Sequence, residues 1–169
     1  NIPAEYQNKI MTWQQAKTLS QSNLVELVSH THSLHRGLPS NGFGNERPAA
    51  VTRQFFPFNQ SYESVSEYRQ RIKYDLGVSV LRLVKEIGKA PIAITWPFGR
   101  FNRIAAEEAT KLGMKFQLTL EDGPTTVETL PMVNRIMLVN DPPIEDFANE
   151  LSYAYAYDES LHFAEVYLE

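Results

Sequence analysis

The most regular pattern of hydrophobic and polar residues lies between residues 61 and 88 and predicts a long amphipathic helix. Apolar side chains recur at three- and four-residue steps, which places them on one helical face. They are Val65, Tyr68, Ile72, Leu76, Val80, Leu83, Val84 and Ile87. Ser64 and Glu67 have the spacing of a capping box, and Gly88 is of the residue type that commonly ends a helix. We therefore expect the helix to begin and end at these positions.

Three shorter segments also carry helical signals. Residues 11–22 begin with Thr12 as a suitable N-cap. Residues 103–113 are amphipathic, and residues 142–151 begin with two prolines, which the first turn of a helix tolerates. We expect a helix in each of these segments.

Short apolar runs between the helices predict strands. The four runs are residues 23–30, 90–96, 114–120 and 134–139. Strands that alternate with helices are typical of parallel βαβ units, so the pattern predicts an α/β fold. Residues 38–60 are rich in glycine, proline, asparagine and aromatic side chains, and we expect a long loop there. Residues 152–169 fit the alternation poorly.

The composition excludes several classes of protein. The chain has 169 residues, of which 43% are hydrophobic, and this suffices for one domain with a core. A net charge of −4 argues against a general nucleic-acid binder, because phosphate contacts need clustered lysine and arginine. The lack of cysteine excludes thiolate metal sites and disulfides. No apolar run approaches the ~20 residues of a membrane span, and we recognise no signal peptide at the start of the sequence.

Three of the four histidines, His30, His32 and His35, follow the first predicted strand closely. In an extended chain His30 and His32 share a face, and His35 joins them if the backbone turns after Thr31. Neutral imidazoles are ligands for zinc and similar ions, and ligands gather at strand ends in α/β proteins. The alternative is that these histidines are polar residues that cap a strand without a metal.

A second candidate site follows the strand predicted at residues 90–96. Trp96 and Phe98 flank Pro97, and Gly99 lets the chain turn sharply. Aromatic rings beside a polar turn suit a sugar-binding groove. A backbone N–H held in such a turn can also face an oxyanion. The alternative is that both rings belong to the core and close the strand.

Taken together, these segments resemble the polysaccharide deacetylases of carbohydrate esterase family 4. The resemblance is strongest to the branch of poly-β-1,6-N-acetyl-D-glucosamine N-deacetylases that process biofilm exopolysaccharide. It rests on SHTHSLH and TWPFG, and on further segments that run in the same order over most of residues 11–151: MTWQQ, SEYRQRIKYDL, KLGMKFQLTLEDG and NRIMLVNDPPIEDFANEL. It implies an α/β fold, a partial (β/α) barrel of the polysaccharide deacetylase (NodB-like) type. Residues 1–151 would form the deacetylase domain, and residues 152–169 would be a tail or the start of a second, glycoside-hydrolase-like domain.

The resemblance also implies roles for individual residues. His30 and His35 correspond to the metal-ligand histidines, with His32 as a neighbour. The metal is a divalent ion, for which zinc is expected and nickel, cobalt and iron are alternatives. The wall of the substrate groove corresponds to Trp96, Pro97, Phe98 and Gly99. The backbone amide of Phe98 corresponds to the donor that binds the oxyanion.

The chain departs from the family pattern in its carboxylates. The family has an Asp-Asp pair upstream of the histidines, in which one aspartate is the general base and the other binds the metal. This sequence has no aspartate before Asp75 and no Asp-Asp pair, and we do not assign Asp122 to that role. No motif places His162 as the general acid. Arg135 falls near a family arginine, with a surface or core-capping role as the alternative. We therefore expect little or no activity from this chain alone.

The resemblance implies N-deacetylation of a poly-N-acetylglucosamine exopolysaccharide in biofilm formation, in the periplasm or at the cell surface. The polymer would be the partner, with no nucleic acid, and any membrane association would come from other segments. One alternative is an amidohydrolase-type site on His30 and His32, although the sequence supplies no later ligands for it. Another is a catalytically inactive carbohydrate-binding domain that holds glycan on Trp96 and Phe98. The last is an α/β domain whose histidines only cap a strand.

Overall fold

The computed structural model describes residues 9–121, 123–137 and 141–153. Asp122 and His162 lie outside the described residues, and so do residues 154–169 of the predicted tail. The predictions made for them are therefore not tested by the fold.

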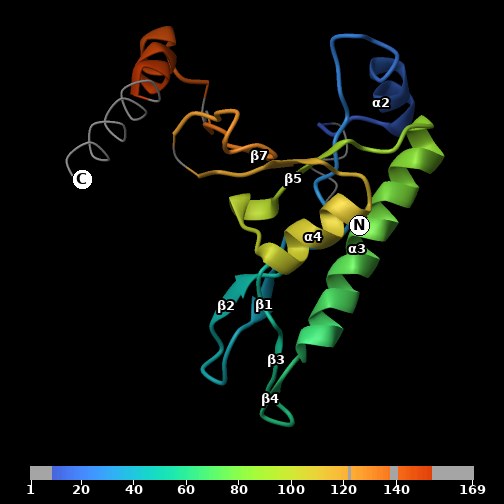
Figure 1. The fold of residues 1–169 in the computed structure, drawn as a ribbon, viewed down its shortest axis with the longest axis vertical. Coiled ribbons are helices and arrows are strands. Elements are labelled where there is room, and N and C mark those ends of the chain that lie inside the picture. Colours follow the sequence, from blue (N-terminus) through green and yellow to red (C-terminus); the bar gives the residue numbers. More distant parts are fainter. Residues whose placement is uncertain (1–8, 122, 138–140, 154–169) are drawn as a thin grey trace.

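The longest element is α3, Val65–Ile87, which runs along one side of the molecule (Figure 1). Its beginning is the predicted capping box, in which Ser64 Oγ accepts a hydrogen bond from Glu67 N at 3.1 Å. The Glu67 carboxylate accepts one in return from Ser64 N at 2.8 Å. The helix ends at Gly88, whose φ of 87° is accessible to glycine at little cost. Both predicted boundaries are confirmed.

A parallel sheet lies beside this helix and consists, in spatial order, of β5 (Ala93–Thr95), β6 (Phe116–Leu118) and β7 (Met132–Val133). Ser29 extends it by a single parallel bridge to Ile94 of β5. In this bridge Ser29 N donates to Ala93 O at 3.1 Å, and Thr95 N donates to Ser29 O at 2.8 Å. The strands therefore follow one another in space as they do in sequence, which is the order of a (β/α) barrel.

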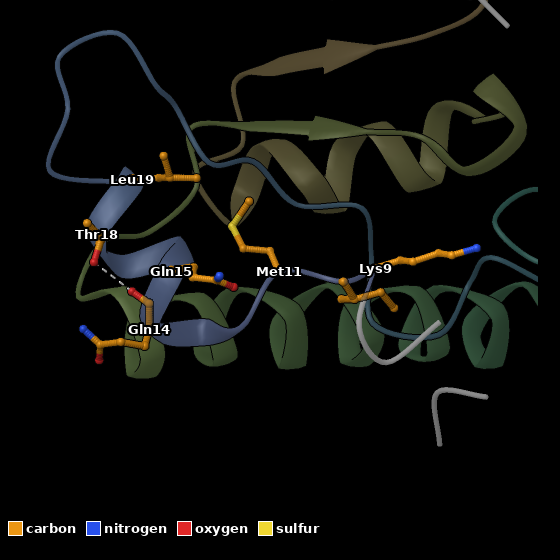
Figure 2. A pocket seen from close by; sticks show the side chains of 7 residues that line it. Lys9, Met11, Gln14, Gln15, Thr18 and Leu19 are labelled. Atoms are coloured by element: carbon orange, nitrogen blue, oxygen red, sulfur yellow. Dashed lines mark hydrogen bonds between the residues drawn. The ribbon is translucent and has the colours of Figure 1, made fainter. Parts of the chain in front are cut away.

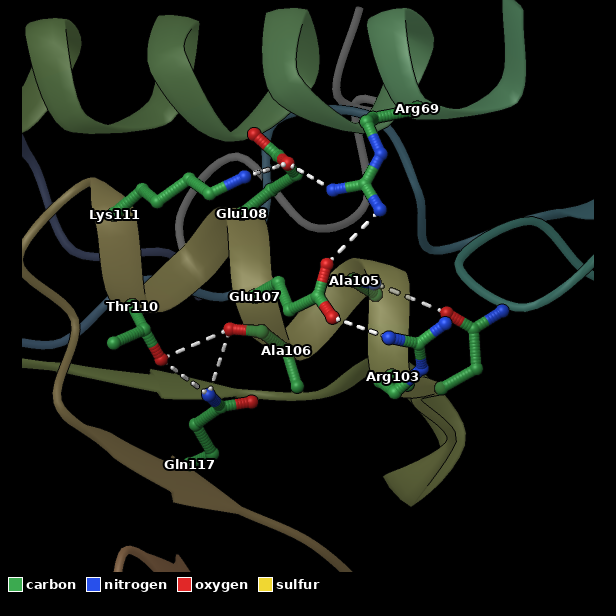
Figure 3. A network of polar contacts seen from close by, with 10 residues as sticks. Arg69, Arg103, Ala105, Ala106, Glu107, Glu108, Thr110, Lys111 and Gln117 are labelled. Atoms are coloured by element: carbon green, nitrogen blue, oxygen red, sulfur yellow. Dashed lines mark hydrogen bonds and ion pairs between the residues drawn. The ribbon is translucent and has the colours of Figure 1, made fainter. Parts of the chain in front are cut away.

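Helix α4, Arg103–Lys111, connects β5 to β6 and packs on α3 (Figure 3). Arg69 of α3 donates to the carboxylates of Glu107 and Glu108. Arg103 also pairs with Glu107, and Lys111 with Glu108. The hydrogen bond from Arg69 holds the pKa of Glu107 below its ordinary range. Burial raises the pKa of Glu108, but the hydrogen bonds from Lys111 and Arg69 outweigh it and leave that pKa lowered.

Side chains from α3, α4, the sheet and the segment that follows the histidines form the hydrophobic core. Its fully or almost fully buried members are Leu34, Leu38, Ala49, Ala50, Tyr68, Ile72, Leu76, Ile94, Trp96, Ala105, Ala109 and Met114. The predicted apolar stripe of α3 is wider than its buried face, because Val65 and Val84 at its margins are exposed.

The prediction of a long loop at residues 38–60 holds for most of the segment but misses the short strands within it. The segment contributes to two antiparallel hairpins, formed by β1 (Gly37–Pro39) with β2 (Glu46–Pro48) and by β3 (Phe55–Phe56) with β4 (Ser61–Tyr62). In the first turn Asn41 Oδ1 accepts hydrogen bonds from Phe43 N and Asn45 N. The residues that suggested a loop are those that tight turns require. Strands of two or three residues are too short to show an alternating pattern.

The shorter helices are confirmed, whereas two strand predictions need correction. Helix α2, Trp13–Leu19, begins at the predicted N-cap Thr12, and the described residues 144–153 are helical. The strand predicted at 23–30 shrinks to the bridge at Ser29. The strand predicted at 134–139 is wrong for residues 134–137, because Asn134 N donates to the side chain of Thr125 and not to a neighbouring strand. Within the described ranges, no helix has the length and apolarity to cross a membrane.

Candidate functional site

The predicted site residues gather at one edge of the parallel sheet. His30 follows the bridge residue Ser29, and the short 3₁₀ turn η1, Pro97–Gly99, follows β5. Arg135 follows β7. Each of these segments leaves the sheet at the carboxyl end of a strand, which is where parallel α/β folds bind their ligands.

The rings of His30 and His35 lie together, with centroids 5.1 Å apart and planes inclined by 48°. His30 Nδ1 donates to the carbonyl oxygen of Thr95 at 2.8 Å. A carbonyl can only accept, so Nδ1 carries a proton, and in the neutral imidazole Nε2 is then the nitrogen with the lone pair. Two imidazoles on one tetrahedral zinc, with Zn–N bonds of about 2.0–2.1 Å, have centres roughly 5 Å apart. The spacing of the two rings therefore fits a shared metal ion.

His32 lies between the two histidines in sequence, and its ring makes no contact with theirs in the described chain. It is exposed, and together with His30 and residues of α2 and α3 it lines a cavity of about 310 Å³. The residues described contain no group of three His, Cys, Asp or Glu side chains placed to hold a metal. The pair of His30 and His35 thus offers two protein ligands, which is half of a tetrahedral shell.

Side chains of α3 hold the backbone between these histidines, which we name the histidine turn (residues 29–35). The buried Asp75 carboxylate accepts hydrogen bonds from His32 N at 2.9 Å, from Ser33 N at 2.8 Å and from Ser33 Oγ at 2.6 Å. One helical turn later, Ser79 Oγ lies 2.7 Å from Ser29 Oγ. The sequence reasoning missed both residues of α3. In the sequence, Asp75 and Ser79 are visible only as two polar residues next to the apolar face of the predicted helix.

Phe98 brings the aromatic turn, the second predicted site, into contact with the histidines, the first predicted site. Its ring stacks on that of His35, with centroids 4.4 Å apart and planes inclined by 30°. The residue is 47% exposed and has a φ of 57°, which is unusual for a bulky side chain. Its N–H donates no hydrogen bond to any residue within the described ranges. Among the described residues this amide therefore has no hydrogen-bond acceptor, and it belongs to the residue whose ring contacts His35.

Trp96 differs from the prediction that it lines an open groove. Its side chain is fully buried, its Nε1 donates to Gln117 Oε1 at 3.0 Å, and its ring stacks on Phe101. Pro97 is buried as well. The indole follows β5 on the side that faces the core, so it matches the alternative of a core aromatic that closes the strand. The Phe98 ring is accessible from solvent, whereas the Trp96 ring is not.

Position 99 accommodates glycine but not a larger residue. Its φ is 65°, and a Cβ atom at this position would lie 2.5 Å from Leu120 Cβ and 2.7 Å from Leu120 N. Real Cβ atoms do not approach other atoms so closely, and side chains other than glycine rarely adopt this φ. The turn that presents Phe98 therefore depends on this glycine.

Arg135 reaches the same edge of the sheet, where its Nε donates to Thr119 O at 3.1 Å. Burial lowers the pKa of its guanidinium, which stays charged at neutral pH. The contact joins the chain after β7 to the chain after β6, as expected for the core-capping alternative.

A wider groove of about 570 Å³ lies apart from the histidine pair, along α2 (Figure 2). It is lined by Lys9, Ile10, Met11, Gln14, Gln15, Thr18 and Leu19. The described residues of this lining include no imidazole and no carboxylate, so they offer no metal ligand of the usual kinds.

Comparison with known proteins gives the chain two curated relatives. It is 36% identical over 140 residues to the poly-beta-1,6-N-acetyl-D-glucosamine N-deacetylase of Escherichia coli strain K12. The alignment covers 83% of this chain and 21% of that protein. The protein of the same name from Escherichia coli O157:H7 matches equally well. The chain spans about a fifth of the length of these relatives, and no protein-family model matches it.

Solved structures match the fold. The BpsB deacetylase domain from Bordetella bronchiseptica superposes with a TM-score of 0.71 and 42% identity over 75% of this chain and 48% of that one. A de-N-acetylase from Aggregatibacter actinomycetemcomitans gives a TM-score of 0.77 and 32% identity over 85% of this chain and 54% of that one. IcaB from Ammonifex degensii, at 18% identity and a TM-score of 0.61 over 78% of this chain and 49% of that one, supports the fold alone. The predicted α/β fold is confirmed over about half the length of these chains.

Proposed function

Because this chain is homologous to part of the poly-β-1,6-N-acetyl-D-glucosamine N-deacetylases, we propose that it is part of a metal-dependent enzyme that removes acetyl groups from a poly-N-acetylglucosamine exopolysaccharide of biofilms. The observation that carries this proposal is the paired rings of His30 and His35, 5.1 Å apart at the carboxyl edge of the sheet and next to Phe98. The other features of this edge support it.

His30 and His35 are the residues that would hold the metal, zinc in our proposal, with nickel, cobalt and iron as alternatives. When bound, such an ion supplies Lewis-acid activation of water and of the acetyl carbonyl. The hydrogen bond from His30 Nδ1 to Thr95 O fixes the tautomer and the direction of the ring, as partners of metal-ligating histidines do. His30 therefore keeps Nε2 as the ring nitrogen that could bind the metal.

Phe98 has two proposed roles toward the substrate. When the acetamide carbon becomes tetrahedral, its oxygen gains negative charge, and a backbone N–H that is free and fixed in a turn stabilises that charge. The Phe98 amide meets this requirement. The exposed Phe98 ring offers a flat apolar surface for a pyranose ring. Trp96, Pro97 and Gly99 support this turn from the core.

The reaction also needs a base that takes the proton of the attacking water and an acid that protonates the leaving amine. No Asp-Asp pair occurs in this sequence. We therefore expect low turnover from the chain as given, and recovery when a segment that carries an Asp-Asp pair is supplied upstream. No recovery would contradict the proposed reaction.

Metal content measured by mass spectrometry tests the site directly. Purified wild-type protein is compared with His30→Ala, His35→Ala and the matched control His32→Ala. We expect near-stoichiometric divalent metal in wild type and in His32→Ala, and its loss in the other two variants. Loss in His30→Ala and His32→Ala, with retention in His35→Ala, would instead favour the amidohydrolase-type site. A wild-type protein without metal would contradict the proposed metal dependence.

A second candidate function is glycan binding without catalysis. The observation that favours it is an exposed Phe98 ring beside a histidine pair for which the described residues supply no third ligand. It predicts that binding of N-acetylglucosamine oligomers survives EDTA and is lost in Phe98→Ala. Under either function we propose a periplasmic or cell-surface location, and a continuation of residues 152–169 into a second domain.

A further inference from the structure

We infer that Asp75 and Ser79, on one face of α3, are positioning residues that bring His30 and His35 together by holding the histidine turn. The inference rests on the proposed function for its consequence, which is metal binding. Its physical basis is separate and lies in the hydrogen bonds between α3 and the turn.

Both carboxylate oxygens of Asp75 bind the histidine turn. The residue is 3% exposed, and its two oxygens accept hydrogen bonds from His32 N, Ser33 N and Ser33 Oγ. Within the described chain it has no lysine, arginine or histidine ion-pair partner. A buried carboxylate is costly unless it is well hydrogen-bonded, and hydrogen bonds to a charged acceptor are strong. The turn is therefore what keeps this carboxylate satisfied, and the carboxylate in return fixes the turn.

Ser79 holds the beginning of the same turn. It lies four residues after Asp75, so both side chains leave α3 on the same face. Ser79 Oγ lies 2.7 Å from Ser29 Oγ, which in turn accepts a hydrogen bond from Thr31 N at 3.1 Å. Ser29 is also the residue that bridges to β5. The turn is thus attached to the sheet at its beginning and to α3 at its beginning and middle.

The backbone of the turn explains why it needs this support. Thr31 has a φ of 70°, in the left-handed region that a β-branched residue rarely adopts. Such conformations persist only where the surrounding contacts enforce them. The reversal at Thr31 is what lets His35 return to His30, so the ring spacing of 5.1 Å depends on a strained residue. Without the hydrogen bonds from Asp75, we expect the turn to relax and the rings to separate.

The test compares Asp75→Asn and the milder Ser79→Ala with wild type. An amide has one acceptor oxygen, and its NH₂ group would face the backbone donors, so Asp75→Asn removes part of the network at nearly constant volume. Glu108→Gln is the matched control, because it alters another buried carboxylate whose ion pairs are with Arg69 of α3 and Lys111 of its own helix α4, neither of which belongs to the histidine turn. The readouts are Zn²⁺ affinity by calorimetry, the visible spectrum of the Co²⁺ form and, without metal, the proton NOE between the His30 and His35 rings.

We expect Asp75→Asn to weaken Zn²⁺ binding by about 10–100-fold, the usual effect of removing a residue that orients metal ligands. The Co²⁺ spectrum should change and the NOE should weaken, with smaller effects in Ser79→Ala and none in Glu108→Gln. Wild-type affinity and NOE in both α3 variants would overturn the inference. If wild type binds no metal, the proposed function fails, while the NOE still decides whether α3 positions the histidines. If Asp75→Asn does not fold, Ser79→Ala decides in the same way.

Discussion

His30 Nδ1 lies 2.8 Å from the carbonyl oxygen of Thr95, a residue 65 positions later in the sequence. This hydrogen bond joins the histidine turn to the strand that leads into the aromatic turn of Trp96 to Gly99. One of the two histidines is therefore oriented by the backbone of the segment that also presents Phe98. The histidine pair and the aromatic turn form one unit in the fold, although each was recognised separately in the sequence.

Added zinc should stabilise the folded chain. A ligand that binds only the native state at 100 times its Kd adds about 2.7 kcal/mol, which raises the Tm of a domain of this size by roughly 5–10 °C. We expect this shift in thermal unfolding of wild type and His32→Ala, and its absence in His30→Ala and His35→Ala. An equal shift in all four proteins would mean that zinc binds elsewhere.

Truncation of Trp96 should destabilise the fold much more than truncation of Phe98. Phe98→Ala removes a half-exposed ring and should cost less than ~1 kcal/mol in the free energy of unfolding. Trp96→Ala empties a core position and should cost about 3–5 kcal/mol. Oligosaccharide binding should weaken in Phe98→Ala but not in Phe58→Ala, a control that removes an exposed ring from the turn between β3 and β4. Undiminished binding in Phe98→Ala would exclude this ring as a sugar platform.

Gly99 and Gly77 form a matched pair of glycines. Gly99→Ala combines a left-handed φ with a clash against Leu120 and should destabilise the fold by about 1–3 kcal/mol or more. Gly77 lies inside α3, and a Cβ atom added there would have open space within 4 Å, so Gly77→Ala should stabilise by roughly 0.5–1 kcal/mol. Urea unfolding measures both changes. A neutral Gly99→Ala would show that the turn can move away from Leu120.

The ion pairs between α3 and α4 should make the free energy of unfolding depend on pH. The pKa values of Glu107 and Glu108 lie below their ordinary value of 4.5 in the folded chain. Their contribution is therefore complete above that value and is lost as the pH falls through the lowered pKa values. Arg69→Met should be less stable than wild type at pH 7, and the difference should shrink below about pH 4.5.

The control for this prediction is Lys73→Met, which removes an exposed cation of α3 that has no ion-pair partner among the residues described. Its stability difference from wild type should show no comparable loss in acid. Urea midpoints between pH 7 and pH 3.5 measure both variants. A difference between Arg69→Met and wild type that stays constant across this range would contradict the assigned role of Glu107 and Glu108.

Features encoded locally were predictable from the sequence. The capping box at Ser64, the terminating Gly88 and the N-cap Thr12 each involve residues within one helical turn, and all three are confirmed. The family resemblance, which rests on SHTHSLH, TWPFG and four further segments in the same order, is confirmed by the homology to N-deacetylases. The pairing of His30 with His35 required a reversal after Thr31, which is the condition expected from the sequence.

What the sequence did not reveal depends on contacts between distant segments. The direction of the Trp96 ring is set by Gln117 on the next strand, so an aromatic beside a proline could not be distinguished as exposed or buried. Asp75 was noted only as the first aspartate, because its partners lie 42 and 43 residues earlier. The hairpin strands of the segment predicted as a loop pair across turns and are too short to leave a periodic signal.

The sequence separation of these contacts has a consequence for folding kinetics. The bonds that shape the histidine turn close loops of 43 residues to Asp75, 50 residues to Ser79 and 65 residues to Thr95. Closing such loops costs chain entropy before the contacts compensate for it, so non-local structure forms more slowly than a helix such as α3. We expect the helix to form first and to provide the surface on which the turn is later fixed. Substitutions that loosen the turn should then mainly accelerate unfolding and leave the folding rate almost unchanged.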